Sequence, residues 1–456
     1  MKYTGNLRAF FKTQKTKDLF FKKQQLLNLK AELQKNEEKI LEALQMDLGK
    51  HYYEGYISEL MLVYQEINHA LRHLKDFHGR KKVSTPLTIF GSKSYIYYEP
   101  YGVVLVISPW NYPISLSLNP LIGAIATGNC VILKPSEYAP VTAQILQKII
   151  KNSLHPDFVK TVCGDYKIAQ ELLQEKFDYI FFTGSTQVGK IIMQEAAKHL
   201  TPTTLELGGK NPCIIHKDAK IAPAAKKVTW AKFINAGQTC IAPDFLLLHS
   251  CVKDEFIEAI KQNLKIFFGE NPIESKNFGK IINLNHFNRL QKLIQENIII
   301  GGTSNQEKLK IEPTVILLDS ENYNQAPIMQ EEIFGPLLPI IIYQTNEELQ
   351  DILDNFQKSL ALYIFTEDRA FSEKILQSQS FGGGCVNDCI AQIANPNLPF
   401  GGIGESGMGR YHGKYTLETF LHQKSIIKAS NFLDTPLRYP PHKNNLKFLR
   451  WLNKFL

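Results

Sequence analysis

A cysteine in a tight loop is the first candidate for chemistry. Cys240 lies in "GQTCIAPD" (237–244), where Gly237 and Pro243 bracket a short loop whose backbone N–H groups can turn toward a ligand. A thiol in an exposed, polarised setting of this kind can act as a nucleophile. A single cysteine is more often a small buried packing residue, however, so the loop alone leaves both interpretations open.

Two further polar residues lie inside or just after apolar runs that are typical of buried strands. Glu206 of "LELGGKNP" (205–212) lies 34 residues before Cys240 (240 − 206) and directly precedes two glycines. Burial would raise its pKa and suit it as a general base, whereas a strand-end glutamate facing solvent fits the same pattern. Asn111 of "PWNYP" (109–113) comes just after an expected strand. Its amide can donate to an oxyanion or simply bridge backbone groups of a loop.

Two turns resemble places where a nucleotide could bind. "FFTGSTQVGK" (181–190) places Gly184 where an expected strand becomes a helix, and the N–H groups of a helix N-terminus can hold a phosphate. The spacing from Gly184 to Gly189 is not GxGxxG, so a packing turn fits equally well. In "KPSE" (134–137), Lys134 can contact a phosphate or ribose, and Glu137 can accept hydrogen bonds from ribose hydroxyls. The alternative is two solvated charges.

The elements that must position these residues alternate between strand and helix. From 103 onward, short β-branched or apolar runs are separated by helical stretches at the spacing of βαβ units. The expected strands are 103–107, 130–133, 158–163, 179–184, 203–207, 213–216 and 245–249, and a helix is expected over 224–236. Helical patterns over 16–48 and about 54–77 precede them. The sequence therefore predicts an α/β protein with a parallel, doubly wound sheet to about 208 and a second α/β domain beyond.

Composition excludes several other classes of protein. The chain has 456 residues and a formal charge of +8, with 52 Lys and Arg against 44 Asp and Glu spread along it, which does not indicate nucleic-acid binding. Its seven cysteines are irregularly spaced, so we expect a reducing, cytoplasmic compartment without a disulfide framework. "CVNDC" (385–389) lacks the further ligands of a zinc site, and we expect no metal. No secretory signal or membrane span is predicted.

Taken together, the motifs resemble the aldehyde dehydrogenase superfamily over nearly the whole chain. The matching blocks are "SPWNYP", "LKPSE", "FTGSTQVGK", "LELGGKNP", "FINAGQTCIAPD", "QEEIFGP" and "PFGGIGESGMGRYHGKYTLETF". "CIAPD", "GRYHG" and "RYPP" are most similar to the class 3 branch, which includes fatty-aldehyde, aromatic-aldehyde and coniferyl-aldehyde dehydrogenases. The resemblance implies NAD(P)-dependent oxidation of an aldehyde to a carboxylic acid, with medium- or long-chain aliphatic or aromatic aldehydes as substrates.

The resemblance also implies a role for each candidate residue. Cys240 would attack the aldehyde and carry a thioester, Asn111 and the Cys240 backbone N–H would hold the oxyanion, and Glu206 would activate water. The implied cofactor is NAD, with NADP also possible, because Glu137 beside the ribose should repel a 2′-phosphate. The residues implied to bind the cofactor are Trp110, Lys134, Glu137, Gly184, Ser185, Val188, Gly189, Glu332 and Phe334.

The implied organisation has two Rossmann-like, doubly wound domains and a β-arm. The expected NAD-binding domain comprises 1–79 and 100–208, and the catalytic domain comprises 209–398. Residues 80–99, which are polar and rich in turns, and 399–430 would form bridging segments that join two subunits in a homodimer. Two alternatives remain: a CoA-acylating dehydrogenase, whose relatives generally lack the glutamate base, and a non-catalytic ligand-binding member of the fold.

The remaining segment, 431–456, ends in "NNLKFLRWLNKFL", which is basic and amphipathic. Leu446, Leu449, Leu452 and Phe455 or Leu456 would share one side of a helix, beside Lys447, Arg450 and Lys454. Such a helix can lie on an anionic membrane surface as a peripheral contact, cover the substrate entrance, or dock on its own dimer. The sequence does not decide among these.

Overall fold

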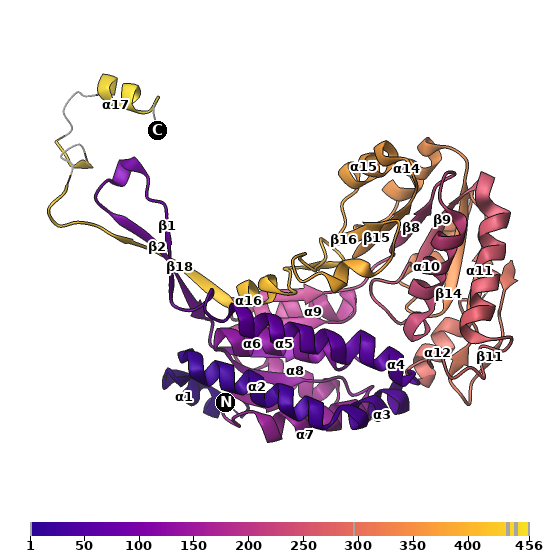
Figure 1. Cartoon of the computed structure of the whole chain (residues 1–456), viewed down its shortest axis with the longest axis horizontal. Coiled ribbons are helices and arrows are strands. Elements are labelled where there is room, and N and C mark those ends of the chain that lie inside the picture. The colour runs from indigo at the N-terminus through magenta and orange to yellow at the C-terminus, as the bar shows by residue number, and fades with distance from the viewer. Residues whose placement is uncertain (1, 295–296, 435–437, 442–445, 455–456) are drawn as a thin grey trace.

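The computed structural model describes residues 2–294, 297–434, 438–441 and 446–454. It confirms the predicted class: two mainly parallel sheets, each flanked by helices, form two lobes, and a small antiparallel sheet leaves the body as an arm (Figure 1). Each central strand is a short apolar run that is buried along its length. That burial is expected where helices cover both faces of a sheet.

The first sheet has the order β17-β7-β6-β3-β4-β5 among the described residues. Neighbouring strands run parallel except at the edge, where β17 pairs antiparallel with β7. The chain moves outward from β3 to β5 and then crosses back to β6, so strand order reverses between β3 and β6. Ligands of doubly wound sheets bind at this point. The bounds are β3 Val103–Ile107, β4 Cys130–Lys134, β5 Val159–Thr161, β6 Tyr179–Thr183, β7 Thr203–Glu206 and β17 Gly407–Met408.

Helices cover the first sheet in two layers on one side. Helix α6 packs against β3 and β4, and α7 packs against β5. Of the N-terminal helices, α2, α3 and α5 pack on α6 or α7, whereas α1 contacts β3 and β4 directly (Figure 1). The helical pattern over 16–48 is two helices, because Asn36 ends the first with its side-chain amide donating to the Glu32 carbonyl. The bounds are α1 Gly5–Lys12, α2 Leu19–Lys35, α3 Glu37–Leu48, α4 Tyr52–Gly55, α5 Met61–His73, α6 Ser115–Thr127, α7 Pro140–Ser153, α8 Tyr166–Leu173 and α9 Thr186–Ala197.

The second sheet has the order β10-β13-β14-β9-β8-β15-β16 within the described chain, with β10 alone antiparallel to its neighbour. Its strands are β8 Pro212–Ile215, β9 Phe245–His249, β10 Ile298–Ile300, β13 Thr314–Leu317, β14 Leu337–Tyr343, β15 Ala361–Phe365 and β16 Gly383–Val386. Its helices include α10 Ile221–Phe233, α11 Lys253–Phe268, α12 Leu284–Gln291, α14 Asn346–Asp354 and α15 Arg369–Ser378. The helix expected over 224–236 is wrong at its end: α10 stops at Phe233, because Asn235 and Ala236 both have φ of 52°.

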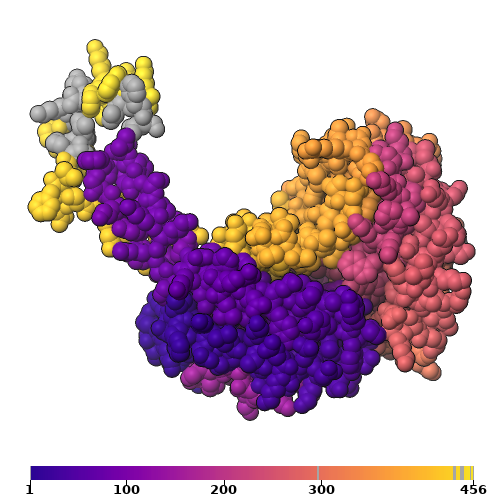
Figure 2. Space-filling model, viewed as in Figure 1, coloured from indigo at the N-terminus to yellow at the C-terminus, as the bar shows by residue number. Residues whose placement is uncertain are grey.

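The polar segment 80–99 forms a hairpin that β18 extends into a three-stranded antiparallel sheet. The strands are β1 Arg80–Val83, β2 Lys93–Pro100 and β18 Leu421–Lys428. Figure 2 shows this arm standing away from both lobes. Within 399–430 the chain does two things: β17 and α16 (Lys414–Thr419) pack on the first lobe, and only β18 joins the arm.

The C-terminal segment lies near the tip of the arm, where α17 (Leu446–Leu452) exposes apolar side chains (Figure 1). Leu446, Phe448, Leu449 and Trp451 are each at least 43% exposed. Phe455 and Leu456, which were expected to extend the same face, lie outside the described residues. Among the residues that are described, no helix has the length and apolar character needed to cross a membrane.

Candidate active site

The two lobes enclose a cleft of about 840 Å³. The first sheet contributes the carboxyl ends of its strands: Asn111 follows β3, Gly184 follows β6 and Gly208 follows β7. The second sheet contributes the opposite ends. Its lining residues precede β8 (Lys210), β9 (Cys240), β14 (Phe334) and β15 (Lys358). The cleft therefore brings the predicted cysteine, glutamate and asparagine together although they lie on different sheets.

The Cys240 loop is built on strained backbone. Three successive residues have positive φ: 52° at Asn235, 52° at Ala236 and 74° at Gly237. Residues other than glycine adopt such backbone angles only at a cost in free energy. At position 237 only glycine fits, because a Cβ there would lie 2.2 Å from the carbonyl oxygen of Gly335. Hydrogen bonds hold the other end of the loop: Asn211 Nδ2 donates to the Cys240 carbonyl at 2.7 Å, and Tyr363 Oη donates to the Ile241 carbonyl at 2.6 Å.

Cys240 is partly accessible and lines the cleft, so its position is not that of an ordinary core residue. Its dense surroundings raise the pKa of the thiol to about 12, and the carboxyl groups of Glu332 and Glu206 add to this rise. The backbone N–H groups of Cys240 and Ile241 act in the opposite direction by favouring the thiolate. Protonation of either carboxyl therefore makes the thiolate easier to form.

Glu206 is buried rather than facing solvent, with 2% of its surface exposed. The edge strand β17 lies beside its backbone, since Gly407 pairs with Glu206, and Gly401 lies close to its carboxyl, where an added Cβ would be 3.2 Å from Oε1. Neither carboxyl oxygen has a hydrogen-bond partner among the described residues. Burial raises the pKa of this carboxyl well above 4.5, which is the condition that suits a general base near neutral pH.

Asn111 is also buried, and its side chain is held in one orientation. Its Nδ2 donates to the carbonyl oxygen of Gln238 at 3.1 Å, so the backbone-bridging interpretation is correct for one of the two amide hydrogens. The same amide carries a second N–H that no described residue accepts, and a group of this kind can donate to an oxyanion. The Oδ1 atom has no partner in the described part of the chain.

The residues predicted to bind the adenosine end divide into two groups. Gly184 and Ser185 line the cleft at the start of α9, where backbone N–H groups can receive a phosphate. Lys134 and Glu137 do not line the cleft as found; Lys134 is buried and pairs with Glu137 at 2.5 Å. Val188 and Gly189 also lie outside the cleft lining. Val188 is exposed to solvent. Gly189 packs closely on Leu207, and a Cβ added to Gly189 would lie 2.7 Å from the Leu207 side chain.

The second lobe contributes Glu332 and Phe334, which composition alone would assign to a loop carboxylate and a core aromatic. Phe334 lines the cleft with φ of 50°, and its ring meets Trp110 edge-on with centroids 5.3 Å apart. Burial, and to a smaller extent Asp244, raises the pKa of Glu332 to about 8, although the Gly209 N–H, Lys210 and Arg289 act in the opposite direction. The lining thus offers an aromatic wall, a cationic group and amides, which suit a long, partly anionic ligand such as a dinucleotide.

Several lining residues were not predicted from the sequence. Thr183 and Lys210 adjoin predicted motifs, and the buried Thr183 Oγ1 has no partner among the described residues. His286 and Arg289 are three apart on α12, and that spacing on one helix face is the signal that could have found them. They were missed because they come from 270–340, where the strand-and-helix alternation is least regular.

Comparison with known proteins shows the family to which the chain belongs. The sequence model of the aldehyde dehydrogenase family matches residues 8–426. The chain is 46% identical over 446 residues to the 4,4'-diaponeurosporen-aldehyde dehydrogenase of Staphylococcus aureus (strain NCTC 8325 / PS 47), covering 97% of this chain and 96% of that protein. It is 43% identical over 437 residues to the dimeric, NADP-preferring aldehyde dehydrogenase of Rattus norvegicus, covering 95% and 96%.

Solved structures give the same result. The substrate-bound state of Staphylococcus aureus AldH superposes with a TM-score of 0.95 at 44% identity, covering 98% of each chain. An indole-3-acetaldehyde dehydrogenase in complex with NAD+ superposes with a TM-score of 0.84 at 26% identity, covering 94% of this chain and 88% of that one.

Proposed function

Because the chain belongs to the aldehyde dehydrogenase family, oxidoreductases that act on aldehydes with NAD or NADP, we propose that it converts an aldehyde to the carboxylic acid through a thioester on Cys240. One observation carries this proposal. Cys240, Glu206 and Asn111 line a single cleft, and among the described residues the Glu206 carboxyl has no hydrogen-bond partner and the Asn111 amide donates only one of its two hydrogens.

In the first step, the Cys240 sulfur forms a bond to the aldehyde carbon, and the carbonyl oxygen becomes an oxyanion. The second N–H of Asn111 and the backbone N–H of Cys240 hold that charge. Loss of one such donor typically costs about 2.7–4 kcal/mol of barrier. The proton of the thiol must leave before attack, and protonation of Glu206 or Glu332 relieves the electrostatic opposition to that loss.

When bound, NAD or NADP supplies a hydride acceptor, which is the chemistry that the side chains themselves lack. The N–H groups at Gly184 and Ser185 would hold its pyrophosphate, and the turn through Val188 and Gly189 shapes that site. Lys134 and Glu137 would contact the adenosine ribose, with Trp110 along the wall. Glu332 and Phe334 would position the nicotinamide end.

In the last step, Glu206 takes a proton from water as the water oxygen attacks the thioester, and the acid leaves with Cys240 restored. A CoA-acylating reaction would not need this base. The Glu206 carboxyl, which is buried and has no hydrogen-bond partner among the described residues, therefore favours hydrolysis.

Formation of the reduced cofactor, measured with and without CoA, tests this function. We expect an aldehyde to be oxidised without CoA, with one equivalent of carboxylic acid per reduced cofactor. Strict dependence on CoA with an acyl-CoA product would establish the acylating alternative. Cofactor binding without turnover of any aldehyde would establish a ligand-binding protein.

We infer that the substrates are medium- or long-chain aliphatic or aromatic aldehydes. The support is the 46% identity to a relative that is named for 4,4'-diaponeurosporen-aldehyde. Comparing kcat/KM across short aliphatic, long aliphatic and aromatic aldehydes tests this inference. A maximum at acetaldehyde would contradict it.

We also propose a homodimer joined through the arm. The arm leaves β1 and β18 as the outer strands of a small sheet, and Leu87 and Phe90 near its tip are more than 70% exposed. Unpaired strand edges with exposed apolar residues favour pairing with another chain. The rat relative is named as dimeric. Sedimentation of the intact chain should give twice the monomer mass, and a monomer would overturn this proposal.

For the C-terminal segment we propose a peripheral contact with an anionic membrane in a cytoplasmic protein. Exposed Leu446, Phe448 and Leu449 lie beside Lys447 and Arg450 on or next to α17. The free state of all seven cysteines is compatible with a reducing compartment. Full-length chain should sediment with anionic vesicles more than a chain ending at 440. Equal sedimentation would favour a helix that docks on the dimer or covers the substrate entrance.

A further inference from the structure

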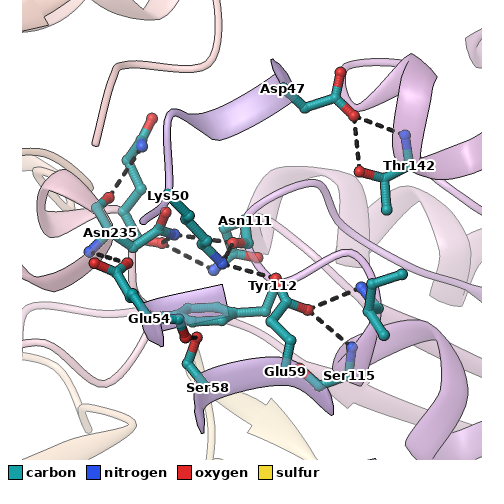
Figure 3. Close-up of polar contacts among 12 residues, drawn as sticks. Asp47, Lys50, Glu54, Ser58, Glu59, Asn111, Tyr112, Ser115, Thr142 and Asn235 are labelled. Atoms are coloured by element: carbon teal, nitrogen blue, oxygen red, sulfur yellow. Dashed lines mark hydrogen bonds and ion pairs between the residues drawn. The ribbon is translucent and has the colours of Figure 1, made fainter. Parts of the chain in front are cut away.

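A fully buried ion pair lies behind the asparagine of the cleft. Lys50, which follows α3, and Glu59, in the π-helical turn between α4 and α5, have no exposed side-chain surface and are 2.7 Å apart. Burial of two charges is costly unless each is also hydrogen-bonded. Here both are bonded, and the partners lie in the loop that carries Asn111 (Figure 3).

The pair holds both ends of that loop. Lys50 Nζ donates to the backbone carbonyl of Asn111 at 2.9 Å and lies 3.9 Å from the ring centre of Tyr112. The second oxygen of Glu59 accepts from the backbone N–H groups of Ile114 and Ser115, at 2.9 and 3.0 Å, where α6 begins.

The same carbonyl of Asn111 also receives a bond from the other lobe. Asn235 Nδ2 donates to it at 2.9 Å and to the Gln238 carbonyl at 3.1 Å. The Gln238 carbonyl is in turn the acceptor for Asn111 Nδ2. A second tie joins Tyr112 Oη to Thr239 Oγ1, 2.7 Å apart, next to Cys240. These bonds set the asparagine loop of the first lobe against the cysteine loop of the second.

The element that carries Lys50 is itself anchored to the second lobe. The Leu48 carbonyl accepts from the Lys280 N–H at 2.9 Å, and Glu54 accepts from the Asn235 N–H at 3.0 Å. Lys50 therefore stands at a point where the N-terminal helices, the asparagine loop and the cysteine loop meet (Figure 3).

We propose that Lys50, paired with Glu59, is a positioning residue for the oxyanion site: its ammonium fixes the Asn111 carbonyl and so sets the distance between the Asn111 amide and Cys240. Lys50 touches neither substrate nor the reacting atoms. This inference rests on the proposed function only in requiring an oxyanion on Cys240.

The test uses a reaction that needs no cofactor. With p-nitrophenyl acetate, the Cys240 sulfur attacks the ester carbon, p-nitrophenolate leaves, and water hydrolyses the thioester to acetate. The oxyanion of this reaction occupies the same site. Ester turnover that depends on Cys240, without oxidation of any aldehyde, would refute the dehydrogenase proposal and leave the positioning role open to the measurements below.

Lys50→Met alone leaves Glu59 as a lone buried charge and can unfold the chain, so the decisive variant is Lys50→Met with Glu59→Gln. The glutamine retains an acceptor for the N–H groups at the start of α6. We expect kcat/KM for the ester to fall about 100-fold, toward the roughly 10²–10³-fold loss expected for Asn111→Ala. The Kd for NAD should change less than about twofold.

Double-mutant cycles separate positioning from general destabilisation. When Asn111 is already alanine, the Lys50→Met, Glu59→Gln substitution should lower kcat/KM for the ester by less than about a further threefold, because the amide that Lys50 positions is gone. Lys22→Met serves as the matched control, since Lys22 is also a buried lysine of the N-terminal helices but lies away from the cleft.

Three outcomes would overturn the positioning role. The first is kcat/KM of the paired variant within threefold of wild type. The second is a combined variant whose loss in kcat/KM equals the product of the losses of the paired substitution and of Asn111→Ala. The third is a wild-type chain that releases no more p-nitrophenol than Cys240→Ala, because there would then be no oxyanion to position.

Discussion

The two ends of the cleft treat their polar groups in opposite ways. At the reactive end, both oxygens of Glu206 and Oδ1 of Asn111 have no hydrogen-bond partner within the described chain. Toward the proposed adenosine end, Lys134 and Glu137 lie outside the cleft lining and are already paired at 2.5 Å, and Ser185 Oγ accepts from the Val188 N–H of its own helix. Buried polar groups without partners cost stability, and beside Cys240 the chain carries that cost at both Glu206 and Asn111. At the α9 turn the exception is Thr183 Oγ1, directly before Gly184, which also has no partner among the described residues.

Substitution of Cys240 should have the largest effect on catalysis while leaving cofactor binding intact. Cys240→Ala should abolish aldehyde oxidation, by at least about 10⁴-fold, because no other group can carry the acyl chain. NAD binding, measured by calorimetry, should survive because the adenosine end is untouched. Oxidation within tenfold of wild type would show that Cys240 is not the nucleophile.

Glu206→Gln should slow the second half of the reaction far more than the first. An amide cannot take the proton of water, so thioester hydrolysis should slow by about 10²–10⁴-fold. Rapid mixing should then show a burst of reduced cofactor followed by slow turnover. A steady-state rate equal to wild type, with normal release of acid, would exclude Glu206 as the base.

The thiol of the cofactor-free protein should titrate far above an ordinary cysteine. Since the pKa of Cys240 is raised to about 12, alkylation by iodoacetamide should still rise about tenfold per pH unit between pH 8 and 11. An exposed cysteine instead levels off above its usual pKa of about 8.5. Mass spectrometry of the Cys240 peptide gives the rate, and a plateau near pH 9 would contradict the effect of burial.

At the adenosine end, the charge of Glu137 should set the choice of cofactor. Glu137→Gln removes repulsion toward a 2′-phosphate, so kcat/KM for NADP relative to NAD should rise about tenfold, equivalent to roughly 1.4 kcal/mol. Wild type should prefer NAD. A higher kcat/KM with NADP for wild type, or an unchanged ratio in the variant, would remove Glu137 from this role.

The smallest effects should be on stability, and they should have opposite signs at the two ends. The pKa of Glu206 is higher folded than unfolded, so its protonated form stabilises the fold below about pH 4.5 and this contribution is lost as pH rises toward the folded pKa. Glu206→Gln should therefore raise Tm by a few degrees at pH 8 and have little effect at pH 4.

Glu137→Gln should lower Tm at pH 8, because buried Lys134 loses its partner. Scanning calorimetry of both variants at the two pH values makes the comparison. Shifts of the same sign at pH 8 would show that the two ends of the cleft are not built differently.

The sequence was most informative where the position of a residue is determined by the strand that carries it or directly precedes it. Val103–Ile107 and the other central strands were readable as apolar runs, because a strand covered on both faces has no polar side. Asn111, Gly184 and Glu206 follow such strands closely, so their location at one sheet edge could be predicted from local pattern. The resemblance of the motifs then supplied roles that no single spacing could give.

The sequence was least informative where a residue depends on a distant partner. Glu206 pairs with Gly407 of β17 and lies close to Gly401, and both of these residues come far later in the sequence. The helix predicted through Ala236 failed because tertiary bonds to Asn235 support a left-handed backbone that local propensity disfavours.

By itself, then, the sequence determined the alternation of strands and helices, the carboxyl-end location of the first lobe's polar residues, and the identity of the nucleophile, base and oxyanion candidates. The tertiary structure alone decided that the second lobe presents the amino ends of its strands, and that Lys50 lies behind Asn111. The physical reason is the distance along the chain over which each kind of interaction acts. Periodicity and turn chemistry act over a few residues, whereas the cleft is set by hydrogen bonds between elements that only folding brings together.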